Sequence, residues 1–390
     1  MKVALISSIY GHGNILFHAG TSLAILMERL KDVSDLDIIT HIGDGRKIKF
    51  SEKIRIIELF SYSEPLSYLK IYSYIRKNHY DLIIVNTMPT SQGSSTLSNL
   101  LFELIPLFSK IFLKRKTMVL YHNSPYLNDV SRLGYNSLFD KIRSIALKIL
   151  ERLIFSNCQV AMLLNSYVRN IKELFPSSKV YHLDMPFLDA LPTLHLNNSL
   201  ELNILSCSSN SPRILLYGSW GPQKDLETSL RALKLLREGG WRFDLTLAGG
   251  INLHNFFGSG DQYSNLVQLY GPLFSRIEGY IDELDIMPLF SSNDIIILPY
   301  RSSGGFSGVL SISMAFEMSI VAPELDEIKE QCGNYRRITF IPINFGPREI
   351  YKGLVKCISS YEPERNINMT PKFKRSIREF ECFIKAWKFD

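Results

Sequence analysis

Short, continuous runs of apolar residues recur along this chain, and segments with helical spacing lie between them. In the first half these runs cover residues 3–9, 81–86, 117–121 and 160–164. Strands that are apolar throughout, rather than alternately apolar and polar, are typical of parallel sheets with helices on both faces. The first half therefore predicts a doubly wound α/β domain whose last strand is the run at 160–164.

An irregular stretch interrupts this rhythm, which then restarts. Residues 186–212 combine prolines with several asparagines and serines, a composition typical of a linker. Apolar runs at 214–217, 243–248, 266–270 and 294–298 then predict strands of a second sheet. The second half therefore predicts another doubly wound domain.

The length of the chain, 390 residues, is sufficient for two domains. We expect an α/β fold with two Rossmann-like domains that face each other across a cleft, at residues 1–190 and 191–370. A final helix is expected at 371–390, where aromatic and aliphatic residues recur along one side. Because ligands of such sheets bind at the carboxyl ends of strands, we expect the functional residues there.

The composition argues against nucleic-acid-binding, disulfide-rich and membrane-spanning proteins. A formal net charge of +6 is small for a nucleic-acid-binding surface, but it fits an anionic ligand such as phosphate or an acidic membrane surface. Five scattered cysteines without a C-x-x-C pair argue against disulfides and zinc and favour the cytoplasm. No apolar stretch reaches the length of a membrane span, and no motif indicates a metal site.

The strongest functional motif is a loop rich in glycine and serine at residues 299–308. It follows a predicted buried strand and precedes a helix that starts near Val309. Main-chain N–H groups of such a loop, together with the helix N-terminus, can bind a phosphate or diphosphate. Gly305 and Gly308 permit close approach of the backbone, and Ser307 adds a hydroxyl donor. A plain turn between a strand and a helix is the alternative.

A second motif follows the predicted strand at 214–217. The sequence Gly218-Ser219-Trp220-Gly221 leads to Lys224 at the start of a helix with leucine spacing. The ammonium group of a lysine is a compact charge that suits phosphate oxygens. The alternative is a solvated surface lysine.

These two motifs together resemble the donor domain of glycosyltransferase family 4, which has the GT-B fold. Residues 218–225, GSWGPQKD, occupy the position of the family's first donor motif, and residues 304–322, GGFSGVLSISMAFEMSIVA, occupy that of its second. The resemblance covers most of the second half, and covers the first half only in architecture and a few residues. It also implies that the helix at 371–390 crosses back onto the first domain.

The resemblance implies an enzyme, a hexosyltransferase. It would move a hexose from a UDP- or GDP-linked sugar to a lipid-linked or other glycan acceptor, in the synthesis of surface polysaccharide, glycolipid or protein glycan. The reaction would retain anomeric configuration and use no metal and no cofactor besides the donor substrate. No nucleic acid is expected as a partner.

The resemblance also implies roles for individual residues. His122, which follows the run at 117–121, is placed like a histidine that the family turns toward the donor sugar; a histidine satisfied by a backbone group is the alternative. Lys224 would stabilise the leaving diphosphate beside it. The acceptor side would include the loop residues Gly11, Gly13 and Asn14. The donor-binding set comprises Gly218, Ser219, Gly249, Leu273, Gly305, Phe306, Ser307, Gly308, Val309 and Glu327.

The sequence departs from the family at three positions. The family's two donor-site glutamates would fall at Gly304 and Ile312, and its loop arginine would fall at Ser219. These losses favour a second hypothesis, a non-catalytic GT-B subunit that binds a glycan or supports a partner enzyme. An unrelated α/β nucleotide-binding protein is a third.

Two segments of the first half combine apolar and basic residues. Residues 97–116 are apolar and end in Lys-Arg-Lys, and residues 139–153 mix aliphatic residues with lysines and arginines. Such segments are able to lie in a membrane interface, but they are also typical of helices that pack on a sheet and expose a basic face. We expect a peripheral contact with the inner face of the cell membrane.

Overall fold

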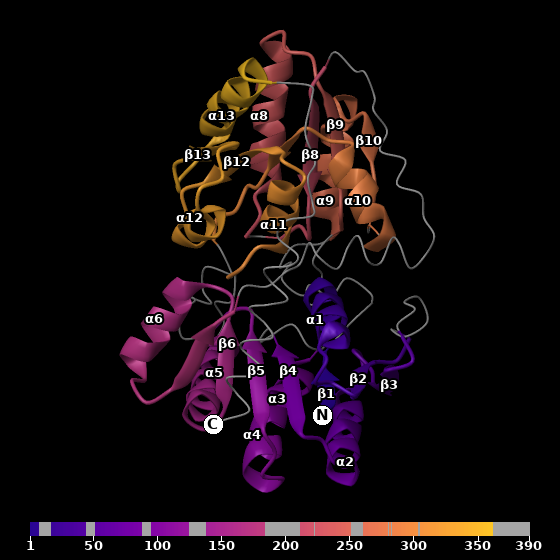
Figure 1. Ribbon diagram of the computed structural model, residues 1–390. Helices are drawn as coiled ribbons and strands as arrows, with labels where there is room; N and C mark the ends of the chain where they lie inside the picture. The colour runs from indigo at the N-terminus through magenta and orange to yellow at the C-terminus, as the bar shows by residue number, and fades with distance from the viewer. Residues whose placement is uncertain are drawn as a thin grey trace. The chain divides into compact units, whose positions relative to one another are not determined.

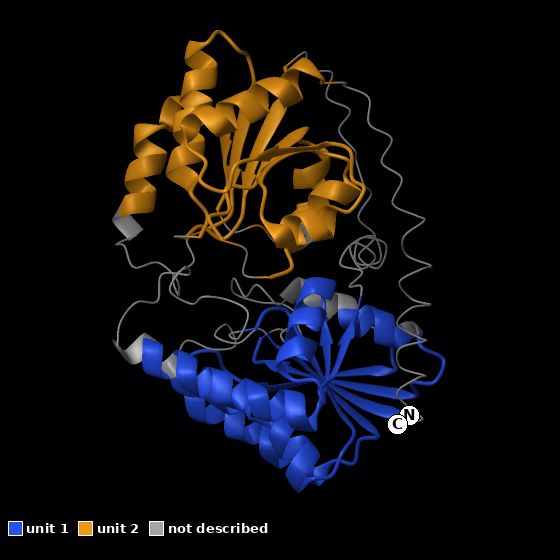
Figure 2. Cartoon of the chain, turned by 90° about the vertical axis from the view of Figure 1, so that its left-hand side faces the viewer, with its two compact units in different colours: residues 1–130, 135–198, 370–390 blue, residues 131–134, 199–369 orange. Residues whose placement is uncertain are grey.

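The computed structural model describes residues 1–7, 17–43, 51–87, 95–124, 138–183, 211–221, 223–250, 260–279, 281, 283–302 and 305–361. These residues belong to two compact units, which Figure 2 shows in different colours. Unit 1 contains the described residues up to 183, and unit 2 those from 211 onward. The predicted domain limits at 190 and 370, and the predicted helix at 371–390, lie outside the described residues.

Unit 1 is built on a seven-stranded parallel sheet with the order β3-β2-β1-β4-β5-β6-β7. The strand order reverses between β1 and β4, which is where doubly wound sheets bind their ligands. All residues of β4 and β5 are buried, as their continuous apolar runs predicted. The strands are β1 (Lys2–Ile6), β2 (Asp35–His41), β3 (Ile54–Phe60), β4 (Leu82–Thr87), β5 (Thr117–Tyr121), β6 (Gln159–Met162) and β7 (Lys179–His182).

The helices of unit 1 connect these parallel strands (Figure 1). Instead of one helix, residues 97–116 form three short helical pieces in succession, and Pro106 lies in the middle one. The helical segments are α1 (Phe17–Arg29), η2 (Pro65–Tyr68), α2 (Leu69–Lys77), α3 (Thr96–Glu103), α4 (Ile105–Leu107), η3 (Phe108–Phe112), α5 (Leu138–Asn157) and α6 (Asn165–Leu174).

Unit 2 is built on a six-stranded parallel sheet with the order β10-β9-β8-β11-β12-β13. Its strand order reverses between β8 and β11. The strands are β8 (Arg213–Tyr217), β9 (Asp244–Ala248), β10 (Arg276–Ile277), β11 (Ile295–Ile297), β12 (Ser319–Pro323) and β13 (Ile338–Ile341).

One hydrophobic core of unit 2 lies between its sheet and the helices α8 and α13, which pack against each other (Figure 1). Trp220, just after β8, is the largest fully buried side chain of this core. The helical segments are α8 (Leu226–Glu238), α9 (Gly260–Leu269), η5 (Gly271–Leu273), α10 (Glu283–Ser291), α11 (Gly308–Ala315), α12 (Asp326–Cys332) and α13 (Pro347–Ser359).

Two predictions about individual strands were wrong. Residues 266–270 lie at the end of α9 and in the turn after it, because a short apolar run fits a helix as well as a strand. The sheet of unit 1 does not end with β6: β7 pairs with it at the edge. Only Val180 is buried in β7, so this strand has no continuous apolar run to reveal it.

Candidate functional site

The loops that follow β8 and β9 touch through their main chains. Gly218 has a φ of +154° and Gly249 a φ of +99°. A Cβ on Gly249 would lie 2.0 Å from the carbonyl oxygen of Gly218, so only glycine fits there. The N–H of Trp220 also donates to the carbonyl of Gly250, at 2.8 Å. Predicted donor residues Gly218 and Gly249 are thus direct neighbours at the carboxyl edge of the sheet.

The side chain of Lys224 lies against Gly218. A Cβ on Gly218 would be 2.6 Å from the Lys224 Nζ, and Nζ lies 5.3 Å from the ring centroid of Tyr300. Burial lowers the pKa of Lys224 to about 8, so the amine is mainly protonated at neutral pH. Within the part of the chain that the structure describes, no carboxylate pairs with it. A bound anion would supply the missing counter-charge.

The backbone beside Lys224 is tied to the loop that follows β11. The Asp225 N–H donates to the Pro299 carbonyl at 2.9 Å, and the Arg301 N–H donates to the Gln223 carbonyl at 2.8 Å. Lys224 lies between Gln223 and Asp225, and Tyr300 lies between Pro299 and Arg301. Lys224 and Tyr300 therefore face each other in an isolated antiparallel β-bridge.

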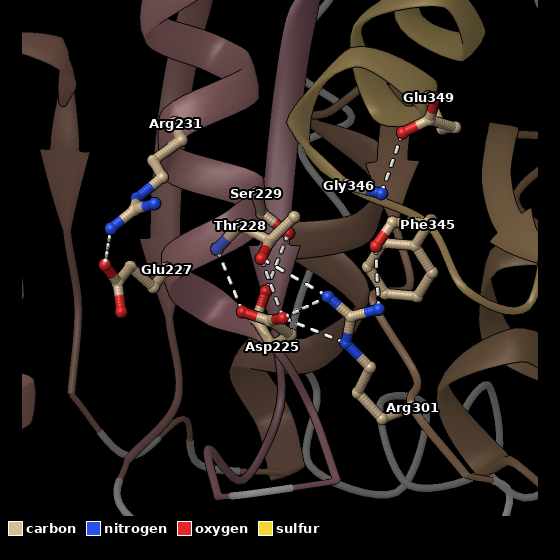
Figure 3. A network of polar contacts seen from close by, with 9 residues as sticks. All are labelled: Asp225, Glu227, Thr228, Ser229, Arg231, Arg301, Phe345, Gly346 and Glu349. Carbon is tan, nitrogen blue, oxygen red and sulfur yellow. Dashed lines mark hydrogen bonds and ion pairs between the residues drawn. The ribbon is translucent and has the colours of Figure 1, made fainter.

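An ion pair strengthens this connection (Figure 3). Arg301 donates from Nε and Nη2 to Asp225 Oδ2, at 2.9 Å and 2.5 Å, and from Nη1 to the Phe345 carbonyl at 2.7 Å. Its guanidinium lies 3.8 Å from the Phe345 ring centroid. Asp225 also caps α8, because its Oδ1 accepts from the Thr228 N–H at 2.9 Å. The hydrogen bonds from Thr228 and Arg301 outweigh burial and lower the pKa of Asp225.

Ser307 connects the start of α11 to both Tyr300 and α12. Its Oγ accepts from the Leu310 N–H at 3.2 Å and lies 3.1 Å from the Tyr300 hydroxyl oxygen. The Ser307 N–H donates to Gln331 Oε1 at 2.9 Å, while Gln331 Nε2 donates to the Ser307 carbonyl at 2.7 Å. Tyr300 therefore contacts both Lys224 and Ser307. The Ser307 N–H, expected to face a phosphate, has a protein partner in this structure.

The other predicted donor residues lie on several elements of unit 2. Leu273 packs into the hydrophobic core, and Ser219 is half-buried in the loop after β8. Glu327 lies half-buried in the first turn of α12. Gly305 is buried with a φ of +126°. The remaining residues are half-buried at the start of α11: Phe306, Gly308 and Val309.

In unit 1, His122 belongs to a buried chain of polar groups at the carboxyl ends of three adjacent strands. Its Nε2 lies 2.7 Å from Asn86 Oδ1, and Asn86 Nδ2 donates to Ser7 Oγ at 2.8 Å. These residues end β5, β4 and β1, next to the reversal of strand order. Burial lowers the pKa of His122 to about 3, so the imidazole is neutral at physiological pH.

A second buried cluster lies on the opposite face of the same strand ends, since successive side chains of a strand alternate. The Thr87 hydroxyl donates to Glu103 Oε1, and the Tyr121 hydroxyl donates to Glu103 Oε2 at 3.0 Å. Burial raises the pKa of Glu103 to about 7, and the two hydrogen bonds oppose this shift. Sequence analysis missed Glu103, although an acidic residue at the end of an apolar helix is a detectable signal.

The predicted catalytic residues belong to different units, His122 to unit 1 and Lys224 to unit 2. The predicted acceptor-side residues Gly11, Gly13 and Asn14 lie outside the described residues. Among the side chains that the structure describes, no group of three His, Cys, Asp or Glu residues could hold a metal ion.

Neither a family model nor a curated protein matches the chain. Solved structures do match along its whole length. Sucrose-phosphate synthase from Thermosynechococcus elongatus is 14% identical with a TM-score of 0.65, covering 100% of this chain and 98% of that chain. Anabaena HepE in complex with UDP and glucose is 12% identical with a TM-score of 0.62, covering 99% and 98%.

A third match is WaaG, a glycosyltransferase involved in lipopolysaccharide biosynthesis. It is 12% identical with a TM-score of 0.60, covering 98% of this chain and 95% of that chain. These similar structures are GT-B proteins. At such low identities the likeness concerns the fold alone, and the chain has the GT-B fold that its sequence predicted.

Proposed function

We propose that the chain is a glycosyltransferase that moves a hexose from a UDP- or GDP-linked sugar to a lipid-linked or other glycan acceptor. The observation that carries this proposal is Lys224, a partly buried cation without a carboxylate partner among the described residues, beside Gly218. The fold supports it, because similar structures include a protein in complex with UDP-glucose. The products would be surface polysaccharide, glycolipid or protein glycan.

The proposed chemistry depends on stabilising the diphosphate that leaves the sugar. Lys224 would supply a full positive charge, and the N-terminus of α11 a partial one. The Ser307 hydroxyl, which lies between Tyr300 and the N-terminus of α11, would add a side-chain group at that end. Such a site needs neither a metal nor an enzyme nucleophile, and we propose retention of anomeric configuration.

His122 would act in this reaction as a hydrogen-bonding group toward the donor sugar. A pKa of about 3 is far from the pH at which a general base is efficient. Asn86 and Ser7 would fix the orientation of its ring. Because the amide oxygen of Asn86 only accepts, the Nε2 of the neutral ring has the proton.

One observation favours the second hypothesis, a non-catalytic GT-B subunit. Ile312, at the position of a family glutamate, is 3% exposed on the buried side of α11. An aliphatic side chain has no group that could hold the hydroxyls of a ribose, which a glutamate at this position would accept from. A subunit that binds a glycan without turnover would tolerate this loss.

A two-stage experiment separates the two functions. A thermal-shift screen of UDP-, GDP- and dTDP-sugars identifies the nucleotide, since a ligand that binds the folded state raises the Tm. Release of the nucleotide diphosphate is then measured with purified glycan acceptors. We expect stabilisation by UDP- or GDP-sugars and turnover that Lys224→Ala abolishes.

Lys234→Ala is the matched control, since this lysine lies on α8 with 60% of its side chain exposed. It should leave both binding and turnover unchanged. Stabilisation without turnover by any acceptor would favour the non-catalytic subunit. Absence of stabilisation by every nucleotide sugar, or full turnover by Lys224→Ala, would overturn the proposed donor site.

A further inference from the structure

The outer face of α5 has a stripe of exposed aliphatic side chains. Ile142, Ile145, Ile149 and Leu153 are 57%, 60%, 58% and 47% exposed. With 3.6 residues per turn, this spacing places them within about 80° of arc on the helix. Single exposed aliphatic residues are ordinary on protein surfaces, but a continuous stripe is typical of a binding face.

Basic side chains follow the same helix beside this stripe. Lys141, Lys148 and Arg152 recur at intervals of seven and four residues, which places them on one side of the helix. Glu151 is buried, at 1% exposure, and no exposed acidic side chain occurs among those that the structure describes on α5. An aliphatic stripe bordered by lysine and arginine is typical of helices that lie in the interface of an anionic bilayer.

The neighbouring segment has the same composition. The short helix α4 packs against α5, as Figure 1 shows, and continues into η3. At the end of η3, Ile111 is 49% and Phe112 is 74% exposed. Lys110, Lys114 and Lys116 are exposed around them. Phe102, Ile105 and Leu107 of the preceding helical pieces are buried in unit 1. Leu97 and Leu100, at the start of the segment, are 47% and 37% exposed.

We propose that these exposed residues of α5 and η3 form a surface by which the protein lies on an anionic lipid bilayer. Among the described residues no helix is long and apolar enough to cross a membrane, so the contact would be peripheral. The charge favours lipid over a second copy of the chain. A two-fold dimer built on this face would bring together the basic rows of both copies, and α5 has no exposed acidic side chain among those described to neutralise them, whereas lipid phosphates would do so. The proposal is independent of glycosyl transfer.

Co-sedimentation with vesicles tests the surface. The full chain is mixed with vesicles of phosphatidylcholine alone and with equimolar phosphatidylcholine and phosphatidylglycerol. We expect it to sediment with the second and to be released by salt. Ile145→Glu/Ile149→Glu should lower the partition coefficient about ten-fold or more, because both carboxylates enter the apolar stripe. Leu174→Glu is the control, since Leu174 ends α6 of the same unit and is 54% exposed.

A second variant separates charge from apolar contact. Lys141→Gln/Lys148→Gln/Arg152→Gln should weaken binding to the anionic vesicles and make the remaining binding less sensitive to salt. Because all these positions are exposed or half-exposed, circular dichroism should show melting curves like those of the parent protein.

Three outcomes would overturn the proposal. The first is equal sedimentation with neutral and anionic vesicles. The second is equal binding by the parent protein and Ile145→Glu/Ile149→Glu. The third is a dimer, measured by light scattering, that this double variant converts to monomer while vesicle binding is absent, because the face would then join two copies of the chain.

Discussion

Replacing Asp225 with Asn tests whether the ion pair behind Lys224 holds that lysine in place. Asparagine caps helices as well as aspartate does, so the bond to the Thr228 N–H at the start of α8 is retained. The change removes the negative charge that Arg301 pairs with and replaces Oδ2, which accepts from Arg301, with an amide nitrogen that cannot accept. Because Lys224 directly precedes Asp225, a change in this pair is transmitted to the lysine through one peptide bond.

The magnitude follows from the contacts of the pair. Arg301 donates two hydrogen bonds to one carboxylate oxygen of Asp225. Hydrogen bonds to charged groups contribute about 1.5–3 kcal/mol. Since 34% of the Arg301 side chain is exposed, solvent screening lowers the expected loss of unfolding free energy to about 1–2 kcal/mol. Displacement of Lys224 should weaken the binding of UDP or GDP about ten-fold, which corresponds to about 1.4 kcal/mol.

Urea unfolding and titration calorimetry measure these two quantities, and Asp294→Asn is the matched control. Asp294 accepts two hydrogen bonds from the guanidinium of Arg213 in the same unit, both at 2.9 Å. This pair lies at the amino ends of β8 and β11, away from Lys224. Asp294 is only 1% exposed, so its loss should cost at least as much stability.

The two variants should therefore differ in what they affect. Asp225→Asn should lower both stability and nucleotide affinity, whereas Asp294→Asn should lower stability alone. If Asp294→Asn weakens nucleotide binding as much as Asp225→Asn does, the effect is one of general stability. If Asp225→Asn is destabilised but binds nucleotide with unchanged affinity, the pair does not position Lys224.

Three further predictions concern protonation and close packing. Nucleotide affinity measured by calorimetry should fall as pH rises above about 8, where Lys224 loses its proton, and Lys224→Met should show no such fall. The Glu103 pKa is raised from 4.5 to about 7, so the folded state binds more protons within this window and its stability should fall by a few kcal/mol as pH rises through it. Urea unfolding of Glu103→Gln should lack this fall, and an equal fall would contradict the assignment. Gly249→Ala should lower the unfolding free energy by about 3 kcal/mol or more, because its Cβ would strike the Gly218 carbonyl. Gly250→Ala, whose Cβ would meet nothing within 4 Å, should change it little.

The parallel sheets could be predicted because strands buried on both faces have a local signature. All residues of β4, β5 and β12 are buried, and their sequences are continuously apolar or nearly so. Elements that depend on partners distant in sequence have no such signature. The edge strand β7 buries one residue and was missed, and the apolar run at 266–270 was assigned to a strand although it ends α9.

The candidate site also contains both residues that the sequence identifies and residues that it does not. Gly218, Lys224 and Ser307 could be identified because each belongs to a short motif at the end of a strand. Their supporting partners could not, because these come from other parts of the chain. Gln331 lies 24 positions after Ser307, and Arg301 lies 76 positions after Asp225.

These partners determine what the loop after β11 can offer to an anion. The main-chain N–H and the carbonyl of Ser307 are both hydrogen-bonded to the side-chain amide of Gln331. Its N–H could bind a phosphate only if Gln331 moved, whereas the Lys224 ammonium needs no such rearrangement. If Asp225 and Arg301 hold the backbone of Lys224 in place as proposed, little ordering of this segment remains to be done on binding. Anion affinity should therefore depend on Lys224 more than on the glycine-rich loop, although that loop is the strongest functional motif in the sequence.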